Sequence, residues 1–331
     1  MPNSPISTPP DINDVKSAAE RIAPYAVRTP LLESPHLNEI AGGRLLIKAE
    51  PLQRTGSFKF RGAFNTVSQL SAEERVGGVV AYSSGNHAQG VAAAAQLLGL
   101  PAIIIMPEDA PKTKIENTKS YGAEVILYDR NSGDREALGE EISRDRSASL
   151  IRPYDDSRII AGQGTVGLEI AEQARERDAS LDAALVCCGG GGLISGCATA
   201  LVHDVPEVEI RAVEPEDFDD TARSLAAGKR LEVDPGGNSF CDALLSPRPG
   251  ELTFEINRRL LAGGLTVSDA QVADAMRQAY SRLKLVVEPG GAVALAAALS
   301  GAFDCRGKTV AVVCSGGNVD AELFAQVLGG G

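Results

Sequence analysis

The chain has 331 residues, of which 44% are hydrophobic, so it can bury a large core, and its length favours two domains. Its formal net charge is −12, which argues against nucleic acid or an anionic membrane surface as the main partner, because a protein that binds a polyanion needs a basic face. No apolar run approaches the roughly 18 residues that a bilayer span requires, so a membrane protein is not predicted.

Residues 1–14, MPNSPISTPPDIND, are rich in proline and serine, and their beginning is expected to fray. They lack the charged start and the apolar middle of a secretory signal peptide, which favours a cytoplasmic protein. The six cysteines agree with this, because their spacing forms no regular framework and Cys187 and Cys188 are adjacent. We expect buried thiols. None of the three histidines lies at metal-ligand spacing from a cysteine or another histidine, so a zinc site is not predicted.

Residues 49–65, AEPLQRTGSFKFRGAFN, place Lys59 between Phe58 and Phe60. A lysine in this position is either an ordinary charge on a helix surface or an amine whose reactivity is tuned by its surroundings. Desolvation by the two phenylalanines would lower the pKa of the amine and make it a better nucleophile.

From about residue 75 onward, short β-branched runs alternate with helical stretches, many of them rich in alanine. Runs such as VVAY, AIIIMP and AALVCC are bounded by glycine or proline and predict buried parallel strands. The chain is therefore predicted to be an α/β protein. We expect a small mobile domain at residues 68–152, inserted into a larger, cofactor-binding domain made of residues 1–67 and 153–331.

A run of four glycines follows one predicted strand and precedes a predicted helix: Gly189, Gly190, Gly191 and Gly192. Backbone amides without side chains can close around an anion, and the positive end of the helix dipole adds to the attraction. The alternative is a plain tight turn. The spacing matches neither the dinucleotide-binding fingerprint nor a P-loop, since no Lys-Ser or Lys-Thr closes the run.

Two further turns, AYSSGNHAQG at residues 81–90 and VVCSGGNVD at 312–320, also place small polar residues after a strand. Because the carboxyl ends of parallel strands line the ligand crevice of α/β proteins, the three turns could converge on one ligand. Each turn alone is equally compatible with helix capping by Ser84, Asn86, Ser315 or Asn318.

A lone amine, a phosphate cradle, and hydroxyl and amide groups without metal ligands are together the components of a pyridoxal phosphate site. The motifs GSFKFRGA, SSGNHAQG, GGGGL and SGGNVD occur in the order and approximate spacing of fold-type II pyridoxal-phosphate enzymes. Over nearly its whole length the chain resembles their serine/threonine dehydratase and serine racemase group, which includes 3-hydroxyaspartate dehydratases. The resemblance implies a fold like that of the tryptophan synthase β subunit, with two three-layer α/β/α domains, and a homodimer.

The resemblance also implies roles for individual residues. Lys59 would form the Schiff base with pyridoxal phosphate and, once freed, remove the Cα proton. Asn86 would bind the phenolic oxygen of the cofactor, Phe58 would pack near its ring, and Ser315 would contact its pyridine nitrogen. The glycine run would hold the phosphate. A neutral hydroxyl at Ser315 does not force a proton onto that nitrogen, which suits elimination. The substrate carboxylate would be bound by Ser83, Ser84, Gly85, Asn86 and His87.

Two residues bear on the choice of reaction and substrate. Many threonine dehydratases carry alanine at the position of Ser84, whereas serine racemases and 3-hydroxyaspartate dehydratases carry serine, which can move a proton on the face opposite the lysine. Ser84 would then support racemisation, or it caps a helix. Arg135 aligns with an arginine near the substrate entrance of serine racemase and could bind a second carboxylate, or it is an exposed helix arginine.

The segment VEPEDFDD holds Glu214 and Asp220, which match the carboxylates that bind magnesium or calcium in racemase-like members of the group. The carbonyl of Phe218 would supply a third oxygen, as hard cations prefer. The alternative is an ordinary acidic loop.

Residues 236–254, GGNSFCDALLSPRPGELTF, depart from the Thr-Ile-Ala-Asp-Gly type segment that is usual in the family and that borders its substrate side. The substrate therefore stays open among threonine, serine and 3-hydroxyaspartate. The expected activity is that of a pyridoxal-phosphate-dependent ammonia-lyase, which eliminates water to give a 2-oxo acid and ammonia. The alternatives are a serine racemase and a noncatalytic protein that binds amino acids or pyridoxal phosphate.

Overall fold

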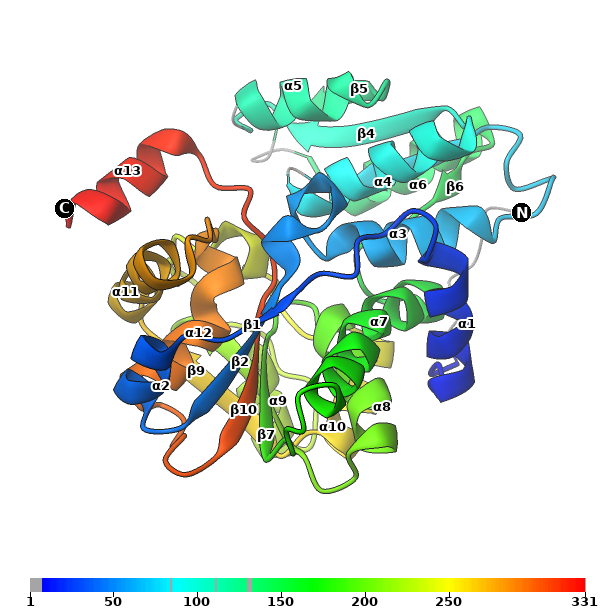
Figure 1. Cartoon of the computed structure of the whole chain (residues 1–331). Coiled ribbons are helices and arrows are strands. Elements are labelled where there is room, and N and C mark those ends of the chain that lie inside the picture. The colour runs from blue at the N-terminus through cyan, green and yellow to red at the C-terminus, as the bar shows by residue number, and fades with distance from the viewer. Residues whose placement is uncertain (1–7, 84, 111, 130–132, 331) are drawn as a thin grey trace.

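A computed structural model describes residues 8–83, 85–110, 112–129 and 133–330, and within them the strands form two separate sheets (Figure 1). The larger sheet has the order β1-β2-β10-β7-β8-β9 and is parallel except for the pairing of β1 with β2. Its strands are β1 (Leu31–Leu32), β2 (Arg44–Ala49), β7 (Ala183–Cys187), β8 (Glu209–Pro215), β9 (Gly263–Val267) and β10 (Thr309–Cys314). The predicted α/β class is confirmed.

The smaller sheet is wholly parallel and has the order β5-β4-β3-β6. Its strands are β3 (Val79–Tyr82), β4 (Ala102–Pro107), β5 (Glu124–Tyr128) and β6 (Ser149–Leu150). All four lie between residues 68 and 152, whereas the larger sheet takes its strands from both flanking parts of the chain. The domain limits themselves stay a prediction.

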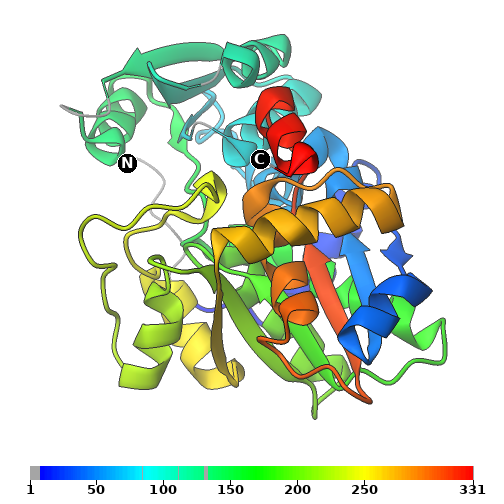
Figure 2. The same cartoon turned by 90° about the vertical axis from the view of Figure 1, so that its left-hand side faces the viewer.

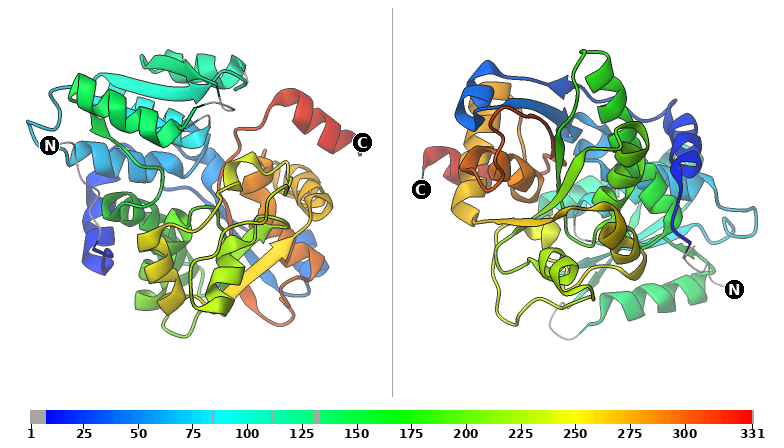
Figure 3. Two further views of the ribbon diagram at one scale, coloured as in Figure 1. Left: turned by 180° about the vertical axis from the view of Figure 1, so that it is seen from behind. Right: turned by 90° about the horizontal axis from the view of Figure 1, so that it is seen from below.

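Helices cover both faces of the larger sheet (Figures 1 and 3). One face carries α1 (Ile12–Ile22), α7 (Ser157–Arg175), α8 (Gly192–Asp204) and α10 (Glu251–Leu260). The other carries α2 (Pro35–Ala41), α11 (Asp269–Gln278) and α12 (Pro289–Ser300), which lie towards the viewer in Figure 2. The remaining elements on this part are α9 (Asp220–Ala227), α13 (Ala321–Gly329), the short helices η1 (Glu50–Leu52), η2 (Arg54–Gly56) and η3 (Asp242–Leu244), and the π turn η4 (Ala279–Leu283).

The smaller sheet is also covered on both faces, as the alternation of side chains along its strands requires. Val79 and Ala81 belong to an apolar cluster beneath α3 (Lys59–Ser68) and α4 (Asn86–Leu98), with α5 (Lys112–Ser120) beside them. The intervening Val80 and Tyr82 pack on the opposite side against α6 (Arg135–Arg146). No helix in the described parts of the chain is both long and apolar enough to cross a membrane.

Helix α3 contacts both α4 and α7, so it joins the two parts of the molecule. A buried ion-pair network fixes it. The guanidinium of Arg61 donates to Glu50 at 2.8 Å and to Glu169 at 2.7 Å, and Arg61 and Glu50 are fully buried. Lys48 donates to the same Glu169 at 2.6 Å. Burial alone would raise the pKa of Glu50, but the adjacent Arg61 guanidinium outweighs this effect and lowers the pKa below its ordinary value.

Removal of Arg61 is expected to destabilise the fold strongly, because Glu50 would be left as a buried and unpaired charge. For Arg61→Leu we expect the free energy of unfolding to fall by about 3–5 kcal/mol in a denaturant titration. The control is Arg28→Leu, which breaks an ion pair with Glu176 whose side chains are 47% and 60% exposed, and which should cost about 1 kcal/mol or less. Equal losses in the two variants would contradict the structural role given to the network.

Candidate active site

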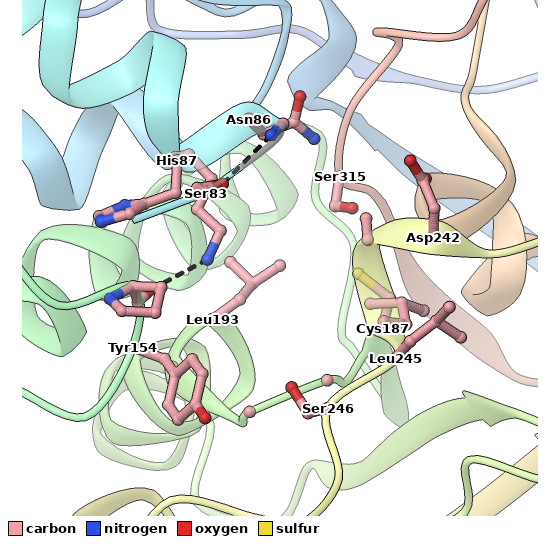
Figure 4. Close-up of a pocket in the computed structure, with 18 of the residues that line it drawn as sticks. Ser83, Asn86, His87, Tyr154, Cys187, Leu193, Asp242, Leu245, Ser246 and Ser315 are labelled. Atoms are coloured by element: carbon pink, nitrogen blue, oxygen red, sulfur yellow. Dashed lines mark hydrogen bonds between the residues drawn. The ribbon is translucent and has the colours of Figure 1, made fainter. Parts of the chain in front are cut away.

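A cavity of about 170 Å³ lies where β3, β7 and β10 end and the following turns begin. Figure 4 shows side chains that enter it from both parts of the molecule, with Ser83 and His87 on one side and Cys187 and Ser315 on the other. The three turns singled out in the sequence therefore converge. The predicted site residues that line the cavity are Phe58, Lys59, Ser83, Gly85, Asn86, His87, Arg135, Gly189, Gly190, Gly191, Gly192 and Ser315. Ser84 lies outside the described residues.

Lys59 is the first residue of α3, and its side chain points into the cavity rather than to the surface. Its Nζ donates a hydrogen bond to the carbonyl oxygen of Pro153 at 2.9 Å and lies 5.2 Å from the centre of the Phe58 ring. Burial lowers the pKa of this amine to about 8, although the nearby Glu288 carboxyl partly opposes the effect. The interpretation of Lys59 as an ordinary surface charge is wrong.

Phe60, the other neighbour of Lys59 in the sequence, does not desolvate the amine as predicted. Phe60 is fully buried and packs against Phe64, with the ring centroids 5.6 Å apart, in the core beneath α3 and α4. Successive helical residues point in directions about 100° apart, so one lysine cannot face the rings on both sides of it. The Phe58 ring and the cavity wall desolvate the amine.

The glycine run forms the turn between β7 and α8. Gly191 has a φ of +95°, and as the N-cap of α8 it offers no side-chain acceptor, so the first amides of α8 remain free to bind an anion. A Cβ atom on Gly190 would clash with the ring of Tyr154, and one on Gly191 would lie 2.8 Å from Thr253. The glycines thus permit close packing behind the turn as well as free amides in the cavity. This cradle fits a phosphate group.

A second helix start faces the same cavity. Helix α4 begins at Asn86 after the N-cap Gly85, which provides no side-chain cap. His87 is buried, and its Nε2 lies 2.9 Å from the carbonyl oxygen of Ile151, so that nitrogen carries the proton. Burial, together with the charge of Lys59, lowers the pKa of His87 to about 3, which keeps the ring neutral. The first amides of α4 can therefore bind a carboxylate beside a neutral histidine.

Asn86 belongs to a hydrogen-bonded chain that contains Glu288, a residue that the sequence analysis missed. The Nδ2 of Asn86 donates to Glu288 Oε1 at 2.6 Å, and its Oδ1 accepts from Asn318 Nδ2 at 2.7 Å. Burial, and secondarily the charge of Asp242, raise the pKa of Glu288 to about 7. In the sequence Glu288 precedes Pro-Gly-Gly, a pattern that signals only the start of a helix.

Ser315 follows β10 and lines the cavity beside Cys187. The capping alternative is wrong for Ser315 and Asn318, because the next helix, α13, has Asp320 as its N-cap. Cys187 is buried, and burial raises the pKa of its thiol to about 11, although the Ser315 side chain partly opposes the effect, so the thiol is neutral. All six cysteines are free and buried, as predicted.

Arg135 is the first residue of α6, and its guanidinium carbon lies 5.9 Å from the centre of the Tyr82 ring. The residue is exposed and also lines the cavity, so it stands at the cavity mouth. The divergent segment 236–254 forms part of the opposite wall through Asp242–Ser246. Asp242 accepts a hydrogen bond from Lys114 of α5 at 2.8 Å, which links the two parts of the molecule across the site.

Glu214 and Asp220 lie close together but do not line the cavity. The Glu214 carboxylate accepts hydrogen bonds from the amides of Thr221 at 3.0 Å and Ala222 at 2.8 Å. Asp220 is buried, and neither of its carboxylate oxygens has a partner within the described chain. Burial raises the pKa of both groups, that of Asp220 to about 7. No group of three or more His, Cys, Asp or Glu side chains is arranged to hold a metal in the part of the chain that the structure describes.

Comparison with known proteins agrees with this geometry. Residues 22–316 match the family model described as pyridoxal-phosphate dependent enzyme. The chain is 44% identical to an L-threo-3-hydroxyaspartate ammonia-lyase of Pseudomonas sp, over 96% of this chain and 98% of that protein. It is 42% identical to a serine racemase of Schizosaccharomyces pombe, over 96% of this chain and 97% of that protein. The solved structure of maize serine racemase has a TM-score of 0.91 and 40% identity, and the match covers 98% of each chain.

The lowered pKa of Lys59 predicts how the cofactor-free protein takes up pyridoxal phosphate, because only a neutral amine attacks an aldehyde. With a pKa of about 8, the uptake rate should rise with pH, reach half its maximum near pH 8 and level off above about pH 9. Stopped-flow absorbance measures this rate, with Lys59→Arg as the control that takes up no cofactor covalently. A rate that still rises steeply at pH 10 would show that the pKa of Lys59 is that of an ordinary lysine.

Proposed function

The chain belongs to the pyridoxal-phosphate dependent enzyme family, and from that premise we propose that it is an ammonia-lyase that removes water from a β-hydroxy amino acid. The products are a 2-oxo acid and ammonia. The observation that carries this proposal is the amine of Lys59, which has no carboxylate partner in the described chain and a lowered pKa, in one cavity with two helix starts that lack side-chain caps. One helix start suits the phosphate of the cofactor and the other suits the carboxylate of an amino acid.

Pyridoxal phosphate, when bound, supplies an aldehyde carbon that joins to an amine and a conjugated ring that accepts the electron pair left at Cα. Gly189–Gly192 would hold its phosphate, and Phe58 would pack near its ring. Asn86, oriented by Glu288 and Asn318, would donate to its phenolic oxygen, and Ser315 would offer its pyridine nitrogen a neutral hydroxyl. These assignments are supported by the positions of Gly189–Gly192, Phe58, Asn86 and Ser315 on the cavity wall.

Lys59 is the base of the proposed reaction. Its Nζ is the amine in the cavity with a pKa lowered towards neutrality, so it can take the Cα proton of the substrate at physiological pH. The carbonyl of Pro153 orients the amine through its 2.9 Å hydrogen bond. The amides at the start of α4, together with Ser83, Gly85, Asn86 and His87, hold the α-carboxylate and so fix which bond at Cα faces the base.

Among threonine, serine and 3-hydroxyaspartate, the cavity mouth favours 3-hydroxyaspartate. Only this substrate carries a second carboxylate, and the guanidinium of Arg135 stands at the mouth with no carboxylate partner among the residues that the structure describes. The similarity to an L-threo-3-hydroxyaspartate ammonia-lyase supports the same choice. A guanidinium can form two parallel hydrogen bonds with this carboxylate, whereas it can form none with the methyl group of threonine.

Arg135→Leu is expected to raise the KM for 3-hydroxyaspartate by about 10- to 100-fold, the loss of one or two charge-assisted hydrogen bonds. The KM for serine should change by less than about threefold. Steady-state assays of 2-oxo acid formation from all three amino acids test both statements. Arg144→Leu, an exposed arginine on the same helix that does not line the cavity, is the matched control. Equal loss with serine would contradict the role of Arg135, and no turnover of any of the three would contradict the lyase.

A serine racemase is the second candidate, favoured by 42% identity to the Schizosaccharomyces pombe enzyme of that name. Ser84, the residue that would move a proton on the second face, lies outside the described residues, so its position adds no support. Chiral chromatography of serine after incubation separates the two activities, because a racemase interconverts the enantiomers with little pyruvate formed. A yellow protein that turns over no amino acid would instead be a noncatalytic binder.

The pair Glu214 and Asp220 is proposed as a site for Mg²⁺ or Ca²⁺, with the carbonyl of Phe218 as a further ligand. The support is the buried carboxylate of Asp220, whose oxygens lack partners in the described chain, next to a second buried carboxylate. Two neighbouring buried carboxylates are costly unless a cation or protons neutralise them.

Asp220→Asn tests the cation site. Added Ca²⁺ at about ten times its Kd should stabilise the wild type by about 1.4 kcal/mol and leave the variant unchanged. Without divalent cations the variant should be at least as stable as the wild type, because a buried unpaired charge is gone. Differential scanning calorimetry measures both, with the exposed Glu216→Gln of the same loop as control. A calcium response retained in Asp220→Asn would contradict the site.

The assembly and location are proposed on other features. Two apolar side chains are exposed near Gly317: Leu52 at 50% and Val286 at 42%. They lie on the same part of the surface, because Pro51 and the Val286 backbone both pack against that glycine. Such an exposed apolar surface supports a homodimer. Sedimentation equilibrium should give twice the mass of one chain.

A location in the cytoplasm is supported by the six buried free thiols, because a reducing compartment keeps thiols from forming disulfides.

A further inference from the structure

The glycine turn is held from behind by α10, whose residues do not line the cavity. The hydroxyl of Thr253 donates to the carbonyl oxygen of Gly190 at 2.7 Å, and the amide of Gly250 approaches the same oxygen at 3.4 Å. Thr253 is fully buried. The position of the Gly190 peptide, and with it the direction of the amides that follow, is therefore set by the first turn of α10.

The same helix also contacts the start of α8. The hydroxyl of Ser195 donates to Asn257 Oδ1 at 2.8 Å and approaches the carbonyl of Thr253 at 3.3 Å. Asn257 is fully buried, and its Nδ2 has no hydrogen-bond partner within the described chain. That nitrogen lies 3.1 Å from the place where a Cβ atom of Gly191 would be. Helix α10 thus forms a polar support for the whole turn from Gly190 to Ser195.

The start of α10 is capped by a residue that is remote in sequence. Its own N-cap, Gly250, has no side chain that could accept hydrogen bonds from the first amides of the helix, and the Asp155 side chain accepts them instead. The Asp155 carboxylate accepts from the amides of Glu251 at 2.9 Å, Leu252 at 2.9 Å and Thr253 at 3.2 Å. The negative charge at the positive end of the helix strengthens these bonds. A Cβ atom on Gly250 would clash with this carboxylate, so the glycine is required by the contact.

We infer that Asp155 is a positioning residue for the anion-binding glycine turn. Its carboxylate fixes the first turn of α10, α10 presents the Thr253 hydroxyl, and that hydroxyl holds the Gly190 carbonyl so that the following amides point at the phosphate. An ordinary cap would stabilise α10 without any effect on the ligand. The inference rests on the family's cofactor and not on the proposed lyase reaction, so it can fail or succeed whichever amino acid the protein acts on.

The test compares pyridoxal phosphate with pyridoxal, which lacks the phosphate, as ligands of the cofactor-free protein in absorbance titrations. Asp155→Asn keeps the size of the side chain but turns one acceptor into a donor that faces amides. Its Kd for pyridoxal phosphate should rise by about tenfold or more, whereas its Kd for pyridoxal stays within about twofold. Thr253→Val should show the same selective loss, and Thr253→Ser, which retains the hydroxyl, should restore wild-type affinity.

Asp11→Asn is the matched control, because Asp11 caps α1 through the amides of Asn13 and Asp14 and does not line the cavity. It should leave both dissociation constants unchanged. Since Asp155 acts through Thr253, the double variant Asp155→Asn/Thr253→Val should lose less than the product of the two single losses. Equal weakening of pyridoxal and pyridoxal phosphate would overturn the inference. So would a Thr253→Ser variant as weak as Thr253→Val, and that result would overturn the inference even if Asp155→Asn does not fold.

Discussion

The desolvation of one amine is the constraint on which the site depends. Lys59 sits at the start of α3 with a carbonyl oxygen, not a carboxylate, as its partner, so its pKa falls towards neutrality instead of rising. The same helix also carries a cation that does have carboxylate partners. Arg61, two residues further on, is paired with Glu50 and Glu169 in the core. One face of α3 thus buries satisfied charges, and its first residue leaves an amine free to react.

The topology explains why residues far apart in sequence meet around that amine. Strand β10 lies between β2 and β7 in the larger sheet, so the turn after β10 lies beside both the segment that leads to Lys59 and the glycine turn. The Ser57–Gly316 bridge and the hydrogen bond from the Phe58 amide to the Ser315 carbonyl join the first two directly. The start of α4 reaches the same space from the smaller sheet. The glycine turn and the start of α4, the two helix starts that face the cavity, therefore come from different parts of the fold.

The sequence predicted the groups whose chemistry is local and missed those whose role is tertiary. The four glycines and the lysine between phenylalanines are each a distinctive pattern within a short stretch of sequence, and both line the cavity as predicted. Pro153, Tyr154 and Asp155 carry no local signal, because a carbonyl, a ring and a cap gain their roles only when β6 and α7 bring that segment beside Lys59 and α10. Glu288 is similar, since a glutamate before a helix is ordinary until burial raises its pKa. The prediction that Phe60 helps to desolvate Lys59 was wrong, because the geometry of the helix turns the Phe60 ring towards Phe64 in the core.

The proposed site requires Lys59 to be the amine that bonds the cofactor. Borohydride reduction of the pyridoxal-phosphate-loaded protein, followed by peptide mass spectrometry, identifies that amine. We expect one stable pyridoxyl adduct, on the peptide that contains Lys59, and loss of the visible absorbance of the protein. An adduct on another lysine, or a loaded protein that yields no adduct at all, would contradict it.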